Sequence, residues 1–136
     1  MSFGEAIAPL VGRCILAGFF ILSGLYKLQN WQETGLFMAQ HGVEVIQPLL
    51  AAAIVVEVGA GAGIILGFRT RLMALVLFVF TIVVSFVMHD FWTMSDPELK
   101  RVEAQLFAKN IAIAGGLLLL LGFGAGRWSY DSWRGD

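Results

Sequence analysis

The chain has 136 residues, of which 58% are hydrophobic and 14% are charged, and its formal net charge is −1. A soluble domain usually carries about 25% charged residues, and a chain of this length has too small an interior to hide such an apolar surplus. Its mean hydropathy of +0.79 therefore indicates an integral membrane protein whose side chains face a lipid bilayer. The near-neutral charge, without a basic tail, argues against nucleic acid as a partner.

The first apolar segment, residues 7–28, is predicted to be a spanning helix of the mature protein. It is too long for a cleavable signal peptide, and it ends in Tyr26 and Lys27 instead of the small residues of a cleavage site. It also contains the single cysteine, Cys14, which allows neither an intrachain disulfide nor a CxxC redox pair. We interpret Cys14 as a small buried apolar residue.

Three further segments, residues 48–68, 72–88 and 106–123, are long enough to cross a membrane. A spanning helix needs about 20 residues, because each residue rises about 1.5 Å. Small residues recur every four positions in two of these segments, which lets helices approach closely. They are Gly59, Gly63 and Gly67, and then Ala108, Ala112 and Gly116. We attribute this pattern to packing within one bundle, with a homo-oligomer as the alternative.

The connections between these segments complete the fold prediction. Residues 29–47 have enough apolar character for a short helix on the membrane surface. Only residues 69–71 separate the second and third segments, which must therefore form an antiparallel hairpin. Residues 89–105 are polar and contain a helix start at Asp96, while the aromatic tail suits a membrane interface. We predict an all-α fold, in which one domain forms an antiparallel bundle of four transmembrane helices.

The distribution of lysine and arginine predicts how the bundle is oriented. Lys100 and Arg101 lie on the side opposite to the termini. The side that holds both termini carries more arginines, namely Arg69, Arg71, Arg127 and Arg134. Because cytoplasmic loops carry the excess of positive charge, we expect both termini to lie in the cytoplasm.

Arg13 and Glu57 are the charged residues expected deepest in the membrane. A charge at that depth costs on the order of 3 kcal/mol by insertion scales, so it marks either a structural pair or a functional site. The rise per residue along two antiparallel helices puts Arg13 and Glu57 at similar depths. We predict a structural Arg13–Glu57 ion pair. The alternative is that Glu57 lines a polar cavity and carries protons.

A second group of polar residues gathers at the end of the bundle opposite to the termini. Lys27 closes the first helix, His89 closes the third and Lys109 opens the fourth, while Trp92 follows His89 closely. There a small ring with carbonyl oxygens would find hydrogen-bond donors and aromatic walls. Each residue also has a simpler interpretation, because lysines at helix ends extend to the interface and tryptophan is common in the aromatic belt.

Other kinds of chemistry have little support in the sequence. The chain has two histidines, His41 and His89, and no spaced set of cysteine and histidine ligands, so we expect no metal site and no haem. No nucleophile–base–acid set and no phosphate-binding loop occurs. No ring of charged residues indicates an ion channel.

Short motifs along nearly the whole chain resemble the DoxX family. In order they are Gly12-Arg13, Ser23-Gly24-Leu25-Tyr26-Lys27-Leu28, Glu57, Leu66-Gly67-Phe68-Arg69-Thr70-Arg71, His89-Asp90-Phe91-Trp92, Gln105-Leu106-Phe107-Ala108-Lys109-Asn110 and Gly126-Arg127-Trp128-Ser129-Tyr130-Asp131. The resemblance implies a four-helix protein of the prokaryotic inner membrane. Characterised members of that family act as small subunits of quinone-linked oxidoreductases, including thiosulfate:quinone oxidoreductase. Other members belong to assemblies linked to thiol and oxidative stress.

The polar cluster and the resemblance together favour a protein that binds quinone or quinol as one component of a membrane redox assembly. His89 and Lys109 would donate hydrogen bonds to a quinone carbonyl, with Lys27 and Trp92 assisting. Glu57 would then be the buried proton carrier. The sequence contains no evident electron-carrying site, so a redox partner protein would supply the electrons. The alternatives are a non-catalytic scaffold or small-molecule transporter, and a structural subunit whose charges only serve packing.

Overall fold

The computed structural model describes residues 2–135, and the chain is 84% helical, with no strand among those residues. Four helices are long and apolar enough to cross a membrane, which confirms the prediction of an all-α polytopic membrane protein. The elements are α1 (Phe3–Gln29), α2 (Trp31–Gln40), α3 (Ile46–Leu66), α4 (Thr70–Met88), the short 3-10 helix η1 (Phe91–Thr93), α5 (Pro97–Phe123) and α6 (Tyr130–Arg134).

Two spanning helices begin four or more residues before their predicted apolar segments, because capping residues start them. Ser2 and Glu5 form a reciprocal capping box at the start of α1. At α5, the Asp96 carboxylate accepts the Glu98 N–H at 3.0 Å, and Pro97 fits a first helical turn, where its missing N–H costs nothing. α5 therefore extends roughly two and a half turns beyond the predicted start at residue 106.

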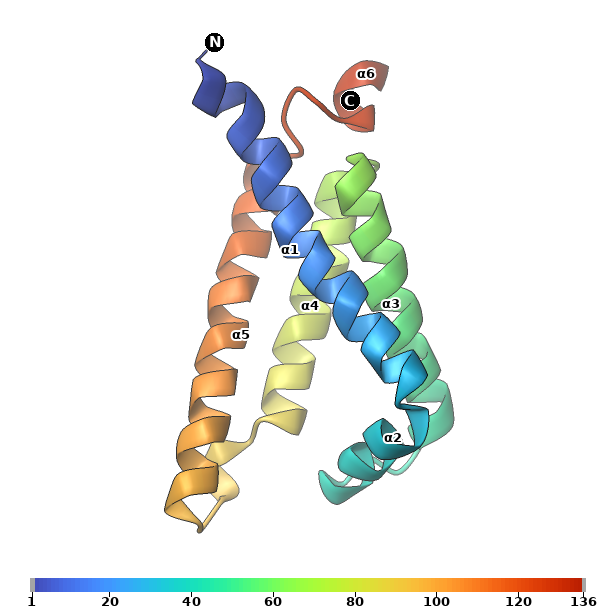
Figure 1. Cartoon of the computed structure of the whole chain (residues 1–136), viewed down its shortest axis with the longest axis vertical. Coiled ribbons are helices and arrows are strands. Elements are labelled where there is room, and N and C mark those ends of the chain that lie inside the picture. The colour runs from blue at the N-terminus through green and yellow to red at the C-terminus, as the bar shows by residue number, and fades with distance from the viewer. Residues whose placement is uncertain (1, 136) are drawn as a thin grey trace.

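The spanning helices pack as two antiparallel pairs, α1 with α3 and α4 with α5, and the α3–α4 hairpin joins the pairs. In Figure 1, α1 crosses the bundle diagonally, and it has little contact with α5. The start of α1 and α6 lie at one end of the bundle, while α2 and the α4–α5 connection lie at the other (Figure 1). The arrangement leaves room for side chains of all four helices to meet between the pairs.

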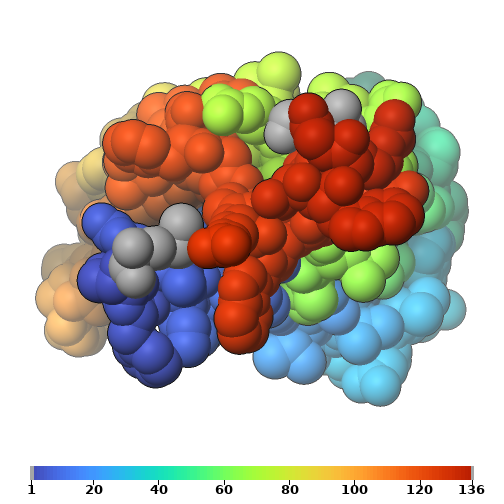
Figure 2. All heavy atoms as spheres, turned by 90° about the horizontal axis from the view of Figure 1, so that it is seen from above, coloured from blue at the N-terminus to red at the C-terminus, as the bar shows by residue number. Residues whose placement is uncertain are grey.

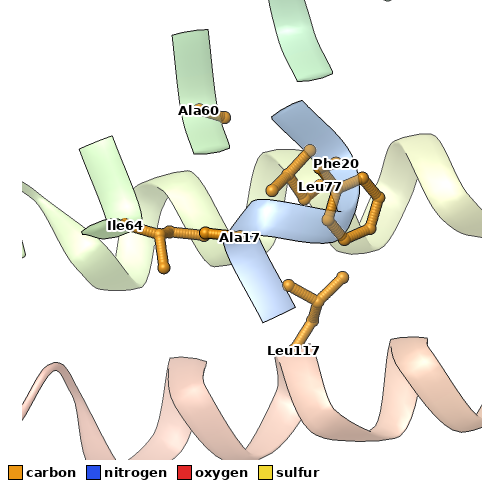
Figure 3. Packing of buried hydrophobic residues seen from close by; sticks show 6 residues of the cluster. All are labelled: Ala17, Phe20, Ala60, Ile64, Leu77 and Leu117. Carbon is orange, nitrogen blue, oxygen red and sulfur yellow. The ribbon is translucent and has the colours of Figure 1, made fainter. Parts of the chain in front are cut away.

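A small apolar core joins the four spanning helices near their middle (Figure 3). Its buried residues are Ala17, Phe20, Ala60, Ile64, Leu77 and Leu117. Only 11–28% of the most apolar stretch of each spanning helix is buried. The remaining apolar side chains face outward, as a surrounding bilayer requires, so close packing rather than the hydrophobic effect must hold the helices together.

Two glycines, Gly24 of α1 and Gly61 of α3, allow these helices to approach closely. A Cβ atom at Gly24 would lie 2.7 Å from Val58 Cγ2, and one at Gly61 would lie 2.7 Å from Ile21 Cγ1. A Cβ at Gly59 would meet no atom within 4 Å. The contact between α1 and α3 thus depends on Gly24 and Gly61, and Gly59, although part of the four-residue repeat, lies outside it.

The segment after α5 closes the end of the bundle where α1 begins. Figure 2 shows it running across that end, between α1 and the α3–α4 hairpin. The Asp131 carboxylate accepts the backbone N–H groups of Arg69 at 2.7 Å and Thr70 at 2.8 Å, and so caps the start of α4. The Asp131 N–H donates to the Gly67 carbonyl at 2.8 Å. α6 is therefore fixed onto the hairpin.

Candidate functional site

A cavity of about 150 Å³ lies among α1, α3, α4 and α5, towards the end of the bundle that carries α2. Four of the five residues predicted to bind a cofactor line it, namely Lys27, Glu57, His89 and Lys109. Phe19, Phe20 and Phe80 form aromatic walls, and Ser23, Thr81 and Asn110 add further polar groups. Charged and aromatic side chains from four helices thus share one space.

Helical spacing explains why distant residues reach this cavity. Thr81 and His89 are eight residues apart in and just after α4, and Glu103 and Asn110 are seven apart in α5, so each pair lies on one helical face. In α1, buried positions recur every three or four residues from Arg13 to Gly24. The same stripe continues to Lys27 and brings its side chain between the helices.

Lys27 and Glu57 form an ion pair at the wall of the cavity. The Lys27 Nζ lies 2.7 Å from Glu57 Oε1 and donates a second hydrogen bond to Ser23 Oγ at 2.8 Å. Glu57 is 1% exposed, and its other oxygen, Oε2, is buried without a hydrogen-bond partner among the described residues. Leaving a buried acceptor unpaired costs about 1–3 kcal/mol, and more for a charged group. Glu57 therefore presents an unused acceptor inside the protein.

His89 and Glu103 form a second pair beside the cavity. The His89 Nδ1 lies 2.6 Å from Glu103 Oε2, and Glu103 is 7% exposed. An ionised carboxylate only accepts hydrogen bonds, so it fixes Nδ1 as the donor and orients the imidazole. Sequence reasoning missed Glu103, because it placed residues 89–105 in a polar connection. The seven-residue spacing between Glu103 and Asn110 is the signal that could have found it.

Lys109 and Phe19 line the cavity and are also exposed at the surface of the bundle. The Lys109 Nζ lies 5.3 Å from the centroid of the Phe19 ring, within the range of a cation–π contact. Because α1 and α5 have little contact with each other, these two side chains form the mouth of the cavity between the helices. Asn110, next to Lys109, is buried deeper, at 9% exposure.

Trp92, the fifth predicted residue, is not among the residues that line the cavity. Its ring packs against Phe86, Phe91 and Phe107 at centroid distances of 5.8, 5.2 and 5.8 Å, and it is 48% exposed. This aromatic cluster holds η1 against α4 and α5. The position of Trp92 is that of an interfacial anchor.

The predicted Arg13–Glu57 ion pair is wrong, because each residue has other partners. The Arg13 guanidinium donates to the carbonyls at the end of α3 and in the segment after α5, namely those of Ile64, Ile65, Ala125 and Trp128, at 3.0, 3.2, 2.6 and 2.6 Å. Glu57 lies level with Gly24 of α1, roughly 16 Å further along the helix by rise per residue. Arg13 meets the last carbonyls of a helix, which lack intrahelical partners.

Comparison with known proteins adds the family. A family model described as DoxX matches residues 8–90. The chain is 35% identical over 134 residues to the inner membrane protein YphA of Escherichia coli, covering 96% of this chain and 94% of that protein. It is 33% identical over 127 residues to the inner membrane protein YqjF of the same organism, covering 93% and 92%.

A more distant relative is found in an animal. The Surfeit locus protein 4 homolog of Drosophila melanogaster is 29% identical over 125 residues, which are 90% of this chain and 39% of that protein. No solved structure matches the chain. The family match and the two bacterial relatives agree with the four spanning helices, and the chain is an integral membrane protein that belongs to the DoxX family.

Proposed function

We propose that this protein binds the head group of a quinone or quinol in its cavity, as one component of a redox assembly in a prokaryotic inner membrane. The observation that carries the proposal is the cavity itself, where Lys27, Glu57, His89 and Lys109 meet aromatic walls. Two relatives are named as inner membrane proteins, which supports the location. A membrane-soluble ligand also suits a site inside the spanning part of a bundle.

The size of the cavity restricts the ligand. A cavity of about 150 Å³ can hold a single six-membered ring, since a cavity of about that volume binds benzene. It is smaller than the roughly 300–1,000 Å³ of sites for drug-sized ligands. Only the ring of a quinone would enter, and its isoprenoid tail would leave between Phe19 and Lys109 into the lipid.

The polar groups fit both oxidation states of such a ring. A quinone carbonyl accepts hydrogen bonds, and Lys109 can donate one. His89 can donate a second from Nε2 when its imidazole is protonated on both nitrogens, because Nδ1 already donates to Glu103. A quinol hydroxyl donates, and the Oε2 atom of Glu57 is an acceptor with no partner within residues 2–135. Reduction of a quinone takes up two electrons and two protons, and His89 with Glu103 and Glu57 with Lys27 are groups able to transfer the protons. We assign electron delivery to a partner protein.

A non-catalytic scaffold or small-molecule transporter is the second candidate, and one observation favours it. Both buried carboxylates are paired, Glu57 with Lys27 and Glu103 with His89, as expected if the charges only lock helices together. The unpaired Glu57 Oε2 argues against packing as their sole purpose, because a purely structural pair would gain from satisfying it. A transporter would use the same cavity without electron transfer.

The test is the quinone content of the protein purified from its native membrane in a mild detergent. The purified protein is extracted with organic solvent, and quinone is quantified by mass spectrometry against protein. His89→Ala removes a cavity donor, and His41→Ala is the matched control, because His41 lies near Asp90 outside the cavity, with 3.7 Å between Nε2 and Oδ1. We expect near-stoichiometric quinone in the wild type and in His41→Ala, and a loss of at least tenfold in His89→Ala.

Two other outcomes would contradict the proposal. Equal trace amounts of quinone in all three proteins would mean that quinone is not the ligand of the cavity. Transport assays would then be the next step. An equal loss in both histidine variants would mean that quinone retention depends on the general integrity of the protein and not on a donor in the cavity.

A further inference from the structure

A second hollow, which we name the arginine groove, lies at the other end of the bundle. It has a volume of about 610 Å³ and lies between the α3–α4 hairpin and the segment after α5. Its lining includes Arg69, Arg71 and Arg127 next to the apolar residues Leu72 and Phe123. We propose that the arginine groove binds the phosphate head group of an anionic phospholipid, whose acyl chain lies against Leu72 and Phe123.

The depth of the groove in the membrane suits a lipid head group. α4 begins and α5 ends here, so the groove lies where spanning helices leave the hydrocarbon core. Leu72 and Phe123 are 46% and 83% exposed, and large exposed apolar side chains at this level face acyl chains. Cations above an apolar rim match a molecule with an anionic head and an apolar tail.

Arg71 is held in place before any ligand binds. Its Nη1 donates to the Leu121 and Gly122 carbonyls at 2.9 and 2.5 Å, which are among the last carbonyls of α5 and lack intrahelical partners. The side chain is therefore tied to the end of α5 rather than free in solution. A guanidinium that is already ordered loses less entropy when it binds a phosphate through its remaining N–H groups.

Arg69 occupies a backbone conformation that an arginine adopts only under strain. Its φ of 45° makes it the one non-glycine residue with positive φ within residues 2–135. Its guanidinium lies 5.9 Å from the centroid of the Phe68 ring. Glycine would relieve the strain, so an arginine at this position indicates that its side chain has a use.

Cationic side chains outnumber carboxylates among the described residues that line the groove. Asp131 also lines it, but both of its carboxylate oxygens already accept backbone N–H groups, from Arg69 and Thr70. Among the described residues that line the groove, Arg69 and Arg71 therefore lie beside one carboxylate, whose oxygens are engaged by backbone N–H groups. A zwitterionic lipid would gain little net attraction here, whereas an anionic lipid gains on the order of fivefold in affinity for each basic residue near its head group.

The experiment measures lipid binding by native mass spectrometry of the delipidated protein. Phosphatidylglycerol and phosphatidylcholine with identical acyl chains are added separately at equal concentrations. Arg69→Gly removes one charge and relieves the backbone strain, so it should fold, and Arg71→Gln removes the second charge. Arg101→Gln is the matched control, because Arg101 is an exposed arginine at the other end of the bundle, paired with Glu98 at 3.0 Å.

We expect the wild type and Arg101→Gln to prefer phosphatidylglycerol, and Arg69→Gly to bind it about fivefold more weakly. In the double variant Arg69→Gly with Arg71→Gln, the loss should be on the order of twentyfold, with phosphatidylcholine binding unchanged. Equal binding of both lipids by the wild type would overturn the proposal, and so would an equal loss in Arg101→Gln. If inorganic phosphate displaces the lipid at a concentration comparable to that of the lipid, the groove is a site for free anions.

Discussion

Glu57 is the residue at which a structural and a functional interpretation of the cavity differ. As a structural group it balances Lys27, since Oε1 and Nζ lie 2.7 Å apart. As a functional group it offers Oε2, which has no partner among the described residues. The two interpretations predict different behaviour when the pair is removed together instead of one residue at a time.

We predict that Glu57→Leu alone destabilises the protein by about 3 kcal/mol, because it leaves the Lys27 ammonium partly buried without a counter-ion. The double variant Lys27→Met with Glu57→Leu should recover most of that stability, since replacing both charges by apolar groups is often nearly neutral. Thermal unfolding in detergent measures both variants. If the double variant is stable but no longer retains quinone, the pair serves the ligand. A double variant as unstable as Glu57→Leu would contradict the prediction.

Sequence patterns predicted which residues are polar and deep, but not which of them pair. The stripe from Arg13 to Lys27 follows from local helical spacing, and so does the position of His89 at the end of α4. The pairing of Lys27 with Glu57 depends on the axial position of α1 relative to α3. The close contacts at Gly24 and Gly61 determine that position. The relative axial position of two helices is a property of the tertiary structure, and the pattern within one helix does not determine it.

At the scale of elements, we predict opposite effects for two glycines that differ in packing. Gly24→Ala should destabilise the α1–α3 pair by about 1–3 kcal/mol, because the new methyl group overlaps Val58. Gly59→Ala adds the same methyl group where nothing lies within 4 Å, and alanine favours a helix by about 1 kcal/mol over glycine. Thermal unfolding in detergent compares them. Equal effects of both substitutions would mean that α1 and α3 do not make this contact.

The contact between α6 and the α3–α4 hairpin should depend on pH. Burial alone would raise the pKa of the Asp131 carboxyl, but hydrogen bonds from Thr70 and Arg69 outweigh it and hold that pKa below its ordinary value. A lowered pKa means that the ionised group stabilises the fold above the unfolded pKa of about 3.9. This stabilisation is lost as the pH falls through the lower pKa of the folded state.

We therefore predict that Asp131→Asn costs about 1 kcal/mol at neutral pH, because the amide nitrogen that replaces one carboxylate oxygen cannot accept the second backbone N–H. The difference from the wild type should shrink as the pH falls below about 4, the ordinary pKa of an aspartate. Melting temperatures of the two proteins across that range provide the measurement. A difference that stays constant with pH would show that ionisation of Asp131 is not the source of the stabilisation.

For the whole molecule, four spanning helices were predictable because apolar length is a local property, whereas the outer extension of α5 was not. The apolar stretch begins near residue 106, but the helix continues outward to the Asp96 cap. This extension places Glu103 against His89, which lines the cavity. The candidate site therefore combines residues of the apolar stretches with a residue that lies outside them. The site needs both, and hydropathy alone locates only the first.

The arrangement also predicts how the bundle lies across the membrane. The arginine groove is at the end where α1 begins, and cytoplasmic ends carry the excess of arginine, so this end should face the cytoplasm and the cavity should lie nearer the outer leaflet. Cys14→Ser removes the single cysteine, and cysteines are then introduced one at a time at Ser132 and Ser95. In intact cells, a membrane-impermeant maleimide should label Ser95→Cys, and Ser132→Cys only after the membrane is opened. The reverse labelling pattern would mean that the bundle has the opposite orientation. The mouth of the cavity between Phe19 and Lys109 would then open near the inner leaflet, and the proposed ligand would enter from the cytoplasmic side.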